Sequence, residues 1–370
     1  MEQVHAPAPP VTPVRARILG IDMARAFAII GMVMVHIGPR DLPGGGLSGA
    51  VYRSTHGRAA IVFIVLAGIG VSLLAGDHSP DRITATRMRL GWRTLVLLPA
   101  GLALQTLDID VAVILQYYAV YFLVAMAALE LSDRALLIVA ASSVTLGPVV
   151  LIWLERTVPD WFLGGVPAWD DASRIVRDIA LTGYYPVVVW TAPLVLGMWI
   201  GRRDLVSTTV VRSVGLAGAV VAAVAFLTSD GLVALLGPAT SSTDASQLYV
   251  IEPHNEMPLW MLSSAGIAVT VIAGCVLLAR RLPRITWPLV AFGQLALTAY
   301  VTHLLVLHRW PQWLDRSTYG AAWLSVSRFT LVALVLATAH RAVAARGPFE
   351  LLLRPSALLS RRQDRPDEGH

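Results

Sequence analysis

One apolar stretch near the N-terminus carries three ionisable side chains. Residues 20–38 read "GIDMARAFAIIGMVMVHIG" and contain Asp22, Arg25 and His36. On a helix, Arg25 and His36 are separated by three turns plus about 20°, so both lie on one face about 16 Å apart. Asp22 precedes Arg25 by three residues, and the two can form an ion pair. The stripe therefore predicts either a site with a general base, since imidazole titrates near neutral pH, or a structural ion pair with a buried histidine.

A second group of candidates is a run of arginines at residues 82–93, "RITATRMRLGWR". Arg89 and Arg93 are four residues apart, so a helix places both guanidinium groups on one face. Clustered guanidinium groups suit the recognition of phosphate. The competing interpretation, preferred for Arg82, is that these arginines only anchor a helix at a membrane surface.

Further candidates lie in the second half of the chain. His254 stands between Glu252 and Glu256 in "EPHNEMP", where a carboxylate can orient an imidazole, and the alternative is a solvated loop histidine. His303 and Arg328 fall inside apolar segments, where each needs a polar partner. They either line a cavity or pair with each other or with the backbone.

Three more residues can face the same cavity. Gln116 begins an apolar segment, and Tyr185 and Trp190 begin another. The two aromatic residues have an alternative role in the aromatic belt of a membrane interface.

The composition indicates what kind of scaffold must position these residues. Of the 370 residues, 56% are hydrophobic and 14% are charged, and the mean hydropathy is +0.65. Soluble domains carry about 25% charged residues, so we predict a membrane protein. The single cysteine, Cys275, excludes an intrachain disulfide. No zinc-type Cys/His spacing is present, so no metal is expected.

The apolar segments predict an all-α, polytopic integral membrane protein. A helix needs about 20 apolar residues to cross the hydrocarbon. About ten spans meet this measure: 18–38, 59–76, 90–107, 111–131, 135–154, 181–201, 212–236, 259–279, 287–308 and 321–341. They form one transmembrane domain at 18–345, between a Pro-rich, disordered cytoplasmic tail at 1–17 and a cytoplasmic C-terminal tail at 346–370.

The arginines predict the orientation. With both termini in the cytoplasm, 19 arginines lie inside and 8 outside, with Arg25 and Arg328 within spans. The positive-inside rule therefore favours an N-in, C-in topology. This distribution also explains the sequence pI of about 9.7 without a nucleic-acid partner.

The first predicted span resembles that of two known families. "RILGIDMARAFAIIGMVMVHIG" is similar to the opening of the heparan-α-glucosaminide N-acetyltransferase catalytic-domain family and of bacterial YeiB-like proteins (domain of unknown function 418). The spacing of Arg25 and His36 also resembles the first helix of acyltransferase family 3. The likeness to the first two families continues, in order, at 56–76, 183–202, 252–269, 287–307 and 346–354.

The resemblance implies acyl transfer across the cytoplasmic (plasma) membrane. The donor would be acetyl-CoA or another acyl-CoA on the inner side, and the acceptor a hydroxyl or amine of an extracytoplasmic sugar or glycolipid. The distance of about 16 Å between Arg25 and His36 is comparable to an extended pantetheine arm. The expected partners are the lipid bilayer, acyl-CoA and the glycan acceptor, and a homodimer stays open.

The resemblance and the residue patterns together give a set of expected site residues. The candidate catalytic histidines are His36, His254 and His56, the last in the loop where the glucosaminide enzymes have theirs. The candidate binding residues are Asp22, Arg25, Arg58, Arg87, Arg89, Arg93, Gln116, Tyr185, Trp190, His303 and Arg328.

Two other function classes use similar residues. A transporter or flippase also needs intramembrane charges, but its halves commonly correspond, and here the charges concentrate in the first three spans. The third reading is a non-catalytic relative, because Ala26 stands where the resembled families usually have Gly.

Overall fold

The computed structural model describes residues 17–39, 46–107, 109–162, 171–241 and 243–354. Within these ranges the regular secondary structure is helical and contains no strand. The α-helices are α1 (Leu19–Ile37), α2 (Gly46–Thr55), α3 (Arg58–Ala75), α4 (Pro80–Gln105), α5 (Leu115–Ala128), α6 (Asp133–Thr157), α7 (Ala172–Arg177), α8 (Val187–Gly201), α9 (Thr208–Leu236), α10 (Pro258–Arg281), α11 (Pro283–Gln294), α12 (Ala296–Arg309), α13 (Tyr319–Val343) and α14 (Pro348–Leu352).

Six stretches of helix are long and apolar enough to cross a membrane: α1, the run α2–α3, α6, α9, α10 and α13. The number rises to eight if each of two bent pairs is one span. These pairs are 172–182 with α8, bent by 59°, and α11 with α12, bent by 69°. The described helices therefore fit an all-α membrane protein. The ten spans and the N-in, C-in orientation stay predictions.

The two remaining predicted spans correspond to α4 and α5. α4 contains four arginines between residues 82 and 93, which lower its hydropathy, and α5 has only 14 residues. The predicted spans 90–107 and 111–131 leave only three residues between them, which would make a tight hairpin. The two helices do pack against each other, but the connection between them runs from 106 to 114.

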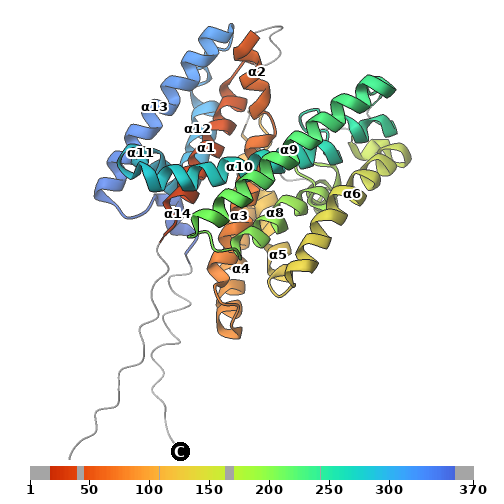
Figure 1. The fold of residues 1–370 in the computed structure, drawn as a ribbon. Coiled ribbons are helices and arrows are strands. Elements are labelled where there is room, and N and C mark those ends of the chain that lie inside the picture. Colours follow the sequence, from red (N-terminus) through yellow and green to blue (C-terminus); the bar gives the residue numbers. More distant parts are fainter. Residues whose placement is uncertain (1–16, 40–45, 108, 163–170, 242, 355–370) are drawn as a thin grey trace, which may run out of the picture.

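The helices differ in how much of their surface is covered. α1 lies against α3, α10 and α11, and α3 also packs on α8 (Figure 1). At the α3–α8 crossing, Gly68 and Gly197 each abut the backbone of the other helix, and neither position has room for a Cβ. The outer helices expose large apolar side chains, for example Leu227 on α9 and Leu331 on α13, at 72% and 64%. Such faces suit contact with lipid chains.

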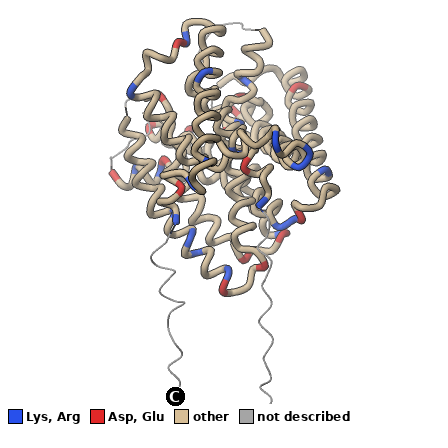
Figure 2. Tube along the Cα trace, turned by 90° about the vertical axis from the view of Figure 1, so that its left-hand side faces the viewer, with Lys and Arg blue, Asp and Glu red and all other residues tan. Residues whose placement is uncertain are grey.

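The first and last described segments meet at one end of the molecule. Arg17 and Leu353 line the same cavity, and Figure 1 shows α14 beside the start of α1. This arrangement fits an even number of membrane crossings. Charged residues also concentrate toward this end, which is the lower end in Figure 2.

The predicted span 287–308 is a broken helix. α11 ends at Gln294 and α12 begins at Ala296, with no proline at the break. The free N–H groups of a helix start need acceptors. Glu350, on α14, accepts from the backbone N–H of Leu297 at 2.8 Å and of Thr298 at 3.0 Å, and from the Thr298 hydroxyl at 2.6 Å.

Candidate functional site

The ion pair expected in the first helix is present and forms the centre of a network. Asp22, 1% exposed, accepts from Arg25 Nη1 at 2.7 Å. It also accepts from Arg17 at 2.6 and 3.0 Å, and from Gln294 Nε2 at 3.4 Å. Gln294 in turn accepts from Arg341 Nε at 2.7 Å. One carboxylate therefore faces two guanidinium groups directly, which leaves positive charge at this end of α1.

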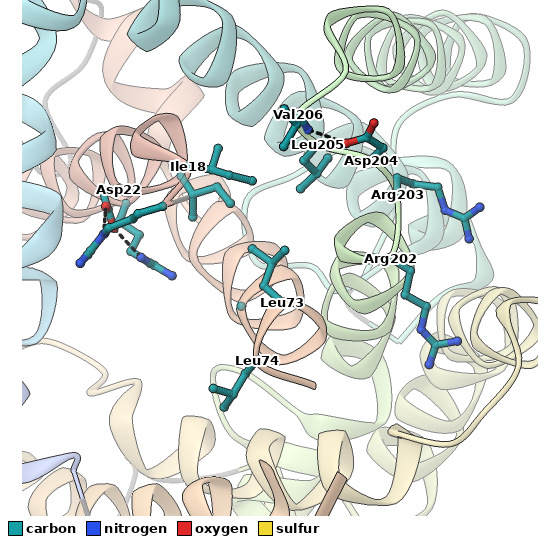
Figure 3. Close-up of a pocket in the computed structure, with 13 residues that line it drawn as sticks. Ile18, Asp22, Leu73, Leu74, Arg202, Arg203, Asp204, Leu205 and Val206 are labelled. Atoms are coloured by element: carbon teal, nitrogen blue, oxygen red, sulfur yellow. Dashed lines mark hydrogen bonds and ion pairs between the residues drawn. The ribbon is translucent and has the colours of Figure 1, made fainter. Parts of the chain in front are cut away.

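A pocket of about 600 Å³ opens beside this network. Figure 3 shows Asp22 with its two arginine partners on one side, and Arg202 and Arg203 from the end of α8 on the other. The heads of Arg202 and Arg203 point away from Asp22 and pair with Asp133. Of the four arginines that line this pocket, Arg17 and Arg25 therefore share a single carboxylate, Asp22.

A second cavity, of about 280 Å³, lies on the other side of Arg25. It shares Arg17, Arg25 and Gly70 with the first pocket. Arg93 lies at its wall, 5.7 Å over the ring of Phe122, and its Nε has no hydrogen-bond partner among the described residues. A partly covered guanidinium without a paired carboxylate suits an anionic ligand.

The wall opposite these arginines is aromatic and apolar. Tyr118 and Tyr300 line the cavity together with Leu97, Ile114 and Leu115. The Tyr300 hydroxyl accepts from the Ile114 N–H at 3.1 Å. The cavity therefore combines arginine side chains with an aromatic and apolar wall, a pattern that suits a ligand with an anionic head and a neutral arm.

A histidine pair lies just beyond Tyr300. His36 Nδ1 and His303 Nε2 are 2.9 Å apart, and the edge of the His303 ring faces Tyr300 with centroids 5.0 Å apart. His303 is 0% exposed and His36 is 7% exposed. Neither histidine lines the cavity itself. The structure thus gives His36 a partner 267 residues away in the sequence, and that partner is His303.

A second cluster combines His56 and His254 with aromatic rings. The centroids of His56 and His254 are 5.6 Å apart, and the His254 ring lies 5.9 Å from Tyr185 and 6.5 Å from Trp190. Trp260, fully buried, completes this ring cluster at 5.9 Å from His254. Trp260 could not be selected from its sequence position, because a tryptophan at the start of an apolar span is usual.

The same cluster holds a buried carboxylate. Glu256, 8% exposed, accepts from the Trp190 indole, and its Oε1 lies 3.7 Å from His254 Nδ1. Burial raises the pKa of Glu256, opposed by its contacts with His254 and Trp190. His254 and Glu256 both have left-handed backbones, with φ of 59° and 60°. Such strain in residues other than glycine is held in place by surrounding structure and is frequent at functional sites.

Tyr52 of α2 connects the two histidine groups. Its hydroxyl donates to the carbonyl of Val35, next to His36, at 3.4 Å, and its ring lies 6.0 Å from that of His56. The segment that forms α2 was expected to be a loop.

Five expected site residues lie outside both the arginine-lined cavities and the two histidine groups. Arg87 pairs with Glu130 on the surface. Arg89 lies close enough to Arg93 for electrostatic repulsion. Arg58 contacts the Ser54 carbonyl and the Phe226 ring. Gln116 is buried and donates to Gln105, and Arg328 is exposed on α13.

Three residues of the cavities were not selected from the sequence. Arg17 was assigned to the N-terminal tail, although a basic residue five positions before Asp22 could have been recognised as a partner. Tyr300 and Glu350 carry no sequence signal of their own, because the bend at 295 brings them to the cavity. Among the described residues, no group of three or more His, Cys, Asp or Glu side chains could hold a metal ion.

Comparison with known proteins yields one family. The model of acyltransferase family 3, described as an acyltransferase domain, matches residues 111–340. The match includes Trp190, His254 and His303, whereas Arg25 and His36 precede it. No curated protein matches the chain significantly.

Proposed function

The chain belongs to acyltransferase family 3, and on this premise we propose that it moves an acyl group from acyl-CoA to an extracytoplasmic acceptor. The donor is acetyl-CoA or another acyl-CoA bound from the cytoplasm. The acceptor is a hydroxyl or amine of a sugar or glycolipid, and the membrane is the cytoplasmic membrane. The observation that carries the proposal is the arginine-lined cavity whose wall includes Tyr300, which packs on His303 of the buried histidine pair.

Arg17, Arg25 and Arg93 supply the anion site for the phosphates of CoA. Guanidinium groups bind phosphate through paired, charge-assisted hydrogen bonds. The pocket of about 600 Å³ provides room for the nucleotide, and the narrower cavity of about 280 Å³ receives the pantetheine arm. The thioester then lies near Tyr300, at the end where His36 stands.

His36 acts as the general base in this proposal. Its ring accepts the proton of the acceptor hydroxyl or amine while the acceptor oxygen or nitrogen attacks the thioester carbonyl. The carbon–sulfur bond then breaks, and the proton passes to the departing sulfur to give the CoA thiol. The products are the acylated acceptor and free CoA.

The cluster of His56 and His254 with aromatic rings binds the acceptor in this proposal. Aromatic rings such as Tyr185 and Trp190 offer flat faces to a sugar ring, and Glu256 and His254 offer hydrogen-bond partners for its hydroxyl groups. Tyr52 lies between this cluster and His36, so an acceptor held there would approach the base from the side of α2.

Binding of the donor is tested by thermal stabilisation of the purified protein. We expect acetyl-CoA and CoA to raise the apparent Tm, because a ligand bound only to the folded state stabilises it. Arg93→Gln should raise the Kd for acetyl-CoA by about 10- to 100-fold, the usual effect of losing a charged hydrogen bond. Arg82→Gln is the matched control, since Arg82 is an exposed arginine of the same helix that faces Asp77.

Two results would contradict this donor site. A wild-type protein that no CoA compound stabilises would exclude it, and so would an equal loss of stabilisation in both arginine variants. The chemical step is tested separately: His36→Ala should abolish acyl transfer while stabilisation by acetyl-CoA persists. Retained activity in that variant would indicate that the general base is His254 or His56 instead.

A transporter or flippase is the second candidate, and the two broken helix pairs favour it. Transporters often place interrupted helices at their substrate site, and here the bends are 59° and 69°. Uptake or flipping of a substrate by a protein that CoA compounds do not stabilise would select this candidate.

A further inference from the structure

We infer that the hydroxyl groups of Tyr118 and Tyr300 bind the carbonyl oxygen of the acyl thioester and stabilise the negative charge that develops there during acyl transfer. The inference rests on the proposed function, which places the thioester in the cavity of about 280 Å³. It adds the two hydrogen-bond donors that act on the reacting carbonyl group.

The hydroxyl of Tyr118 is buried without a hydrogen bond. Tyr118 is 5% exposed, and its hydroxyl oxygen has no hydrogen-bond partner among the described residues. A buried hydroxyl in this condition costs free energy, and phenylalanine would fill the same space without that cost. A partner that arrives only with a ligand explains such a group.

The neighbours of Tyr118 indicate where its hydroxyl points. Its ring packs edge-on against Phe63 and Phe122, with centroids 5.5 and 6.0 Å away. The hydroxyl lies within electrostatic range of Arg25 and Tyr300. All five of these residues line the cavity of about 280 Å³. The aromatic neighbours therefore hold the ring, and the hydroxyl lies on its cavity side.

Tyr300 supplies the second donor. Its hydroxyl oxygen accepts from the N–H of Ile114 at 3.1 Å, and among the described residues no acceptor takes the hydroxyl hydrogen. A phenol can accept and donate at once, so this hydrogen stays available. The Tyr300 ring is 2% exposed and packs on His303, with centroids 5.0 Å apart. The oxygen is therefore fixed in place while its O–H can donate to a ligand in the cavity.

Two such donors match the change in charge at a thioester carbonyl. When the acceptor oxygen or nitrogen attacks the carbonyl carbon, the C=O double bond becomes a C–O⁻ single bond. Hydrogen bonds from the two phenols stabilise this oxygen, and both phenols keep their protons. The double bond then re-forms as the carbon–sulfur bond breaks, and the sulfur leaves as the CoA thiol with the proton from the acceptor. The apolar neighbours Leu97 and Leu115 strengthen these hydrogen bonds because they exclude water.

The variant Tyr118→Phe tests the first donor. We expect kcat to fall about 100- to 1,000-fold, the usual effect of losing one donor to a developing oxyanion. The Kd for acetyl-CoA should change little, because the interaction is strong only in the transition state. The apparent Tm without ligand should stay the same or rise, because the hydroxyl has no partner in the free protein. A packing role predicts the opposite, a lower Tm with unchanged kcat.

Tyr117→Phe is the matched control. Tyr117 precedes Tyr118 in α5 and is also buried, with a hydroxyl that has no hydrogen-bond partner among the described residues. It lines neither arginine-lined cavity. We expect its kcat to equal that of the wild type. Unchanged kcat in Tyr118→Phe, or an equal loss in both variants, would overturn the inference.

The hydrogen bonds to the carbonyl oxygen are measured by isotope-edited infrared spectroscopy. The probe is acetyl-CoA labelled with ¹³C at the carbonyl carbon and bound to the protein without an acceptor. We expect the carbonyl band at lower wavenumber in the wild type and in Tyr117→Phe than in Tyr118→Phe and Tyr300→Phe. An identical band in the wild type and in Tyr118→Phe would overturn the inference.

This measurement needs a bound donor but no turnover, so it separates two kinds of failure. Binding of acetyl-CoA with no difference between the bands contradicts only the role of the two tyrosines. Absence of binding contradicts the proposed function itself and the inference with it.

Discussion

At the scale of single residues, the site contains two contacts of different range: Arg25 with Asp22 inside α1, and His36 with His303 across 267 residues. Helical periodicity placed Arg25 and His36 on one face and predicted the bond from Arg25 to Asp22, which the structure contains. It could not predict that His36 meets His303, because a contact across 267 residues depends on how the helices pack. Local spacing carries no information about such packing.

The buried carboxylate of Glu256 gives a prediction for the pH dependence of stability. Burial raises its pKa, so the folded state binds this proton more tightly than the unfolded state does. Its stabilising contribution is complete below the ordinary glutamate pKa, about 4.3, and is lost as the pH rises through the folded value. Glu256→Gln cannot ionise, and its side-chain oxygen can still accept from Trp190.

We therefore expect the apparent Tm of Glu256→Gln, relative to wild type, to increase between acidic and neutral pH. Thermal unfolding of both proteins across this range provides the measurement. Glu252→Gln is the control, because Glu252 is exposed in the same segment and should show no such trend. A difference between Glu256→Gln and wild type that stays constant or decreases with pH would contradict the prediction.

At the scale of helices, a close contact between the backbones of α11 and α1 determines where Asp22 and its arginine partners lie. Gly293, at the end of α11, lies against the backbone carbonyl of Asp22, and a Cβ there would also come within 3.0 Å of the Ala26 nitrogen. The absence of a side chain at 293 therefore allows α11 to reach α1. The same contact brings Gln294 to Asp22.

Gly293→Ala should lower both stability and donor binding. The added methyl group must push α11 from α1, which costs about 1–3 kcal/mol in a packed interior. The shift also disturbs Asp22 and Arg25, so stabilisation by acetyl-CoA should weaken. Apparent Tm with and without acetyl-CoA is the measurement.

Gly274→Ala is the matched control for this substitution. Gly274 lies in α10, and a Cβ at that position would meet nothing within 4 Å. We expect it to be neutral or slightly stabilising, because alanine favours helix more than glycine does. Equal destabilisation by the two substitutions would mean that the α1–α11 contact has no special role.

The helices themselves were predicted better than their interruptions. Nearly every apolar segment of suitable length became a helix, because length and hydropathy are local properties. The bend at 295 was not predictable, since no proline stands there and its cap, Glu350, lies more than 50 residues later. The helix α2 was missed because its short polar sequence resembles a loop.

At the scale of the whole molecule, the orientation in the membrane can be tested with cysteines. We predict that Asp204→Cys, between α8 and α9, faces the cytoplasm, and that Gln312→Cys, between α12 and α13, faces outward. Both side chains are exposed, and Cys275, which is buried, would be replaced by Ala. A membrane-impermeant thiol reagent added to intact cells should label position 312 and not 204.

Labelling of position 204 and not of position 312 would show that the orientation is the reverse of the predicted one. Labelling of both positions would contradict the prediction that the chain crosses the membrane an odd number of times between them. Permeabilised cells provide the control, since both cysteines should then react. The result bears on the donor site directly, because Asp204 lies in the wall of the pocket that contains Arg25.

Residues from both ends of the described chain line the smaller arginine-lined cavity, and this has a consequence for biosynthesis. Arg17 and Arg25 leave the ribosome long before Glu350 and Leu353, which line the same cavity. The ion pairs of Asp22 with Arg17 and Arg25 are local, so α1 can enter the bilayer with its charges already matched. His36 can meet His303 only after α12 has been synthesised, so the contact forms long after α1 is made.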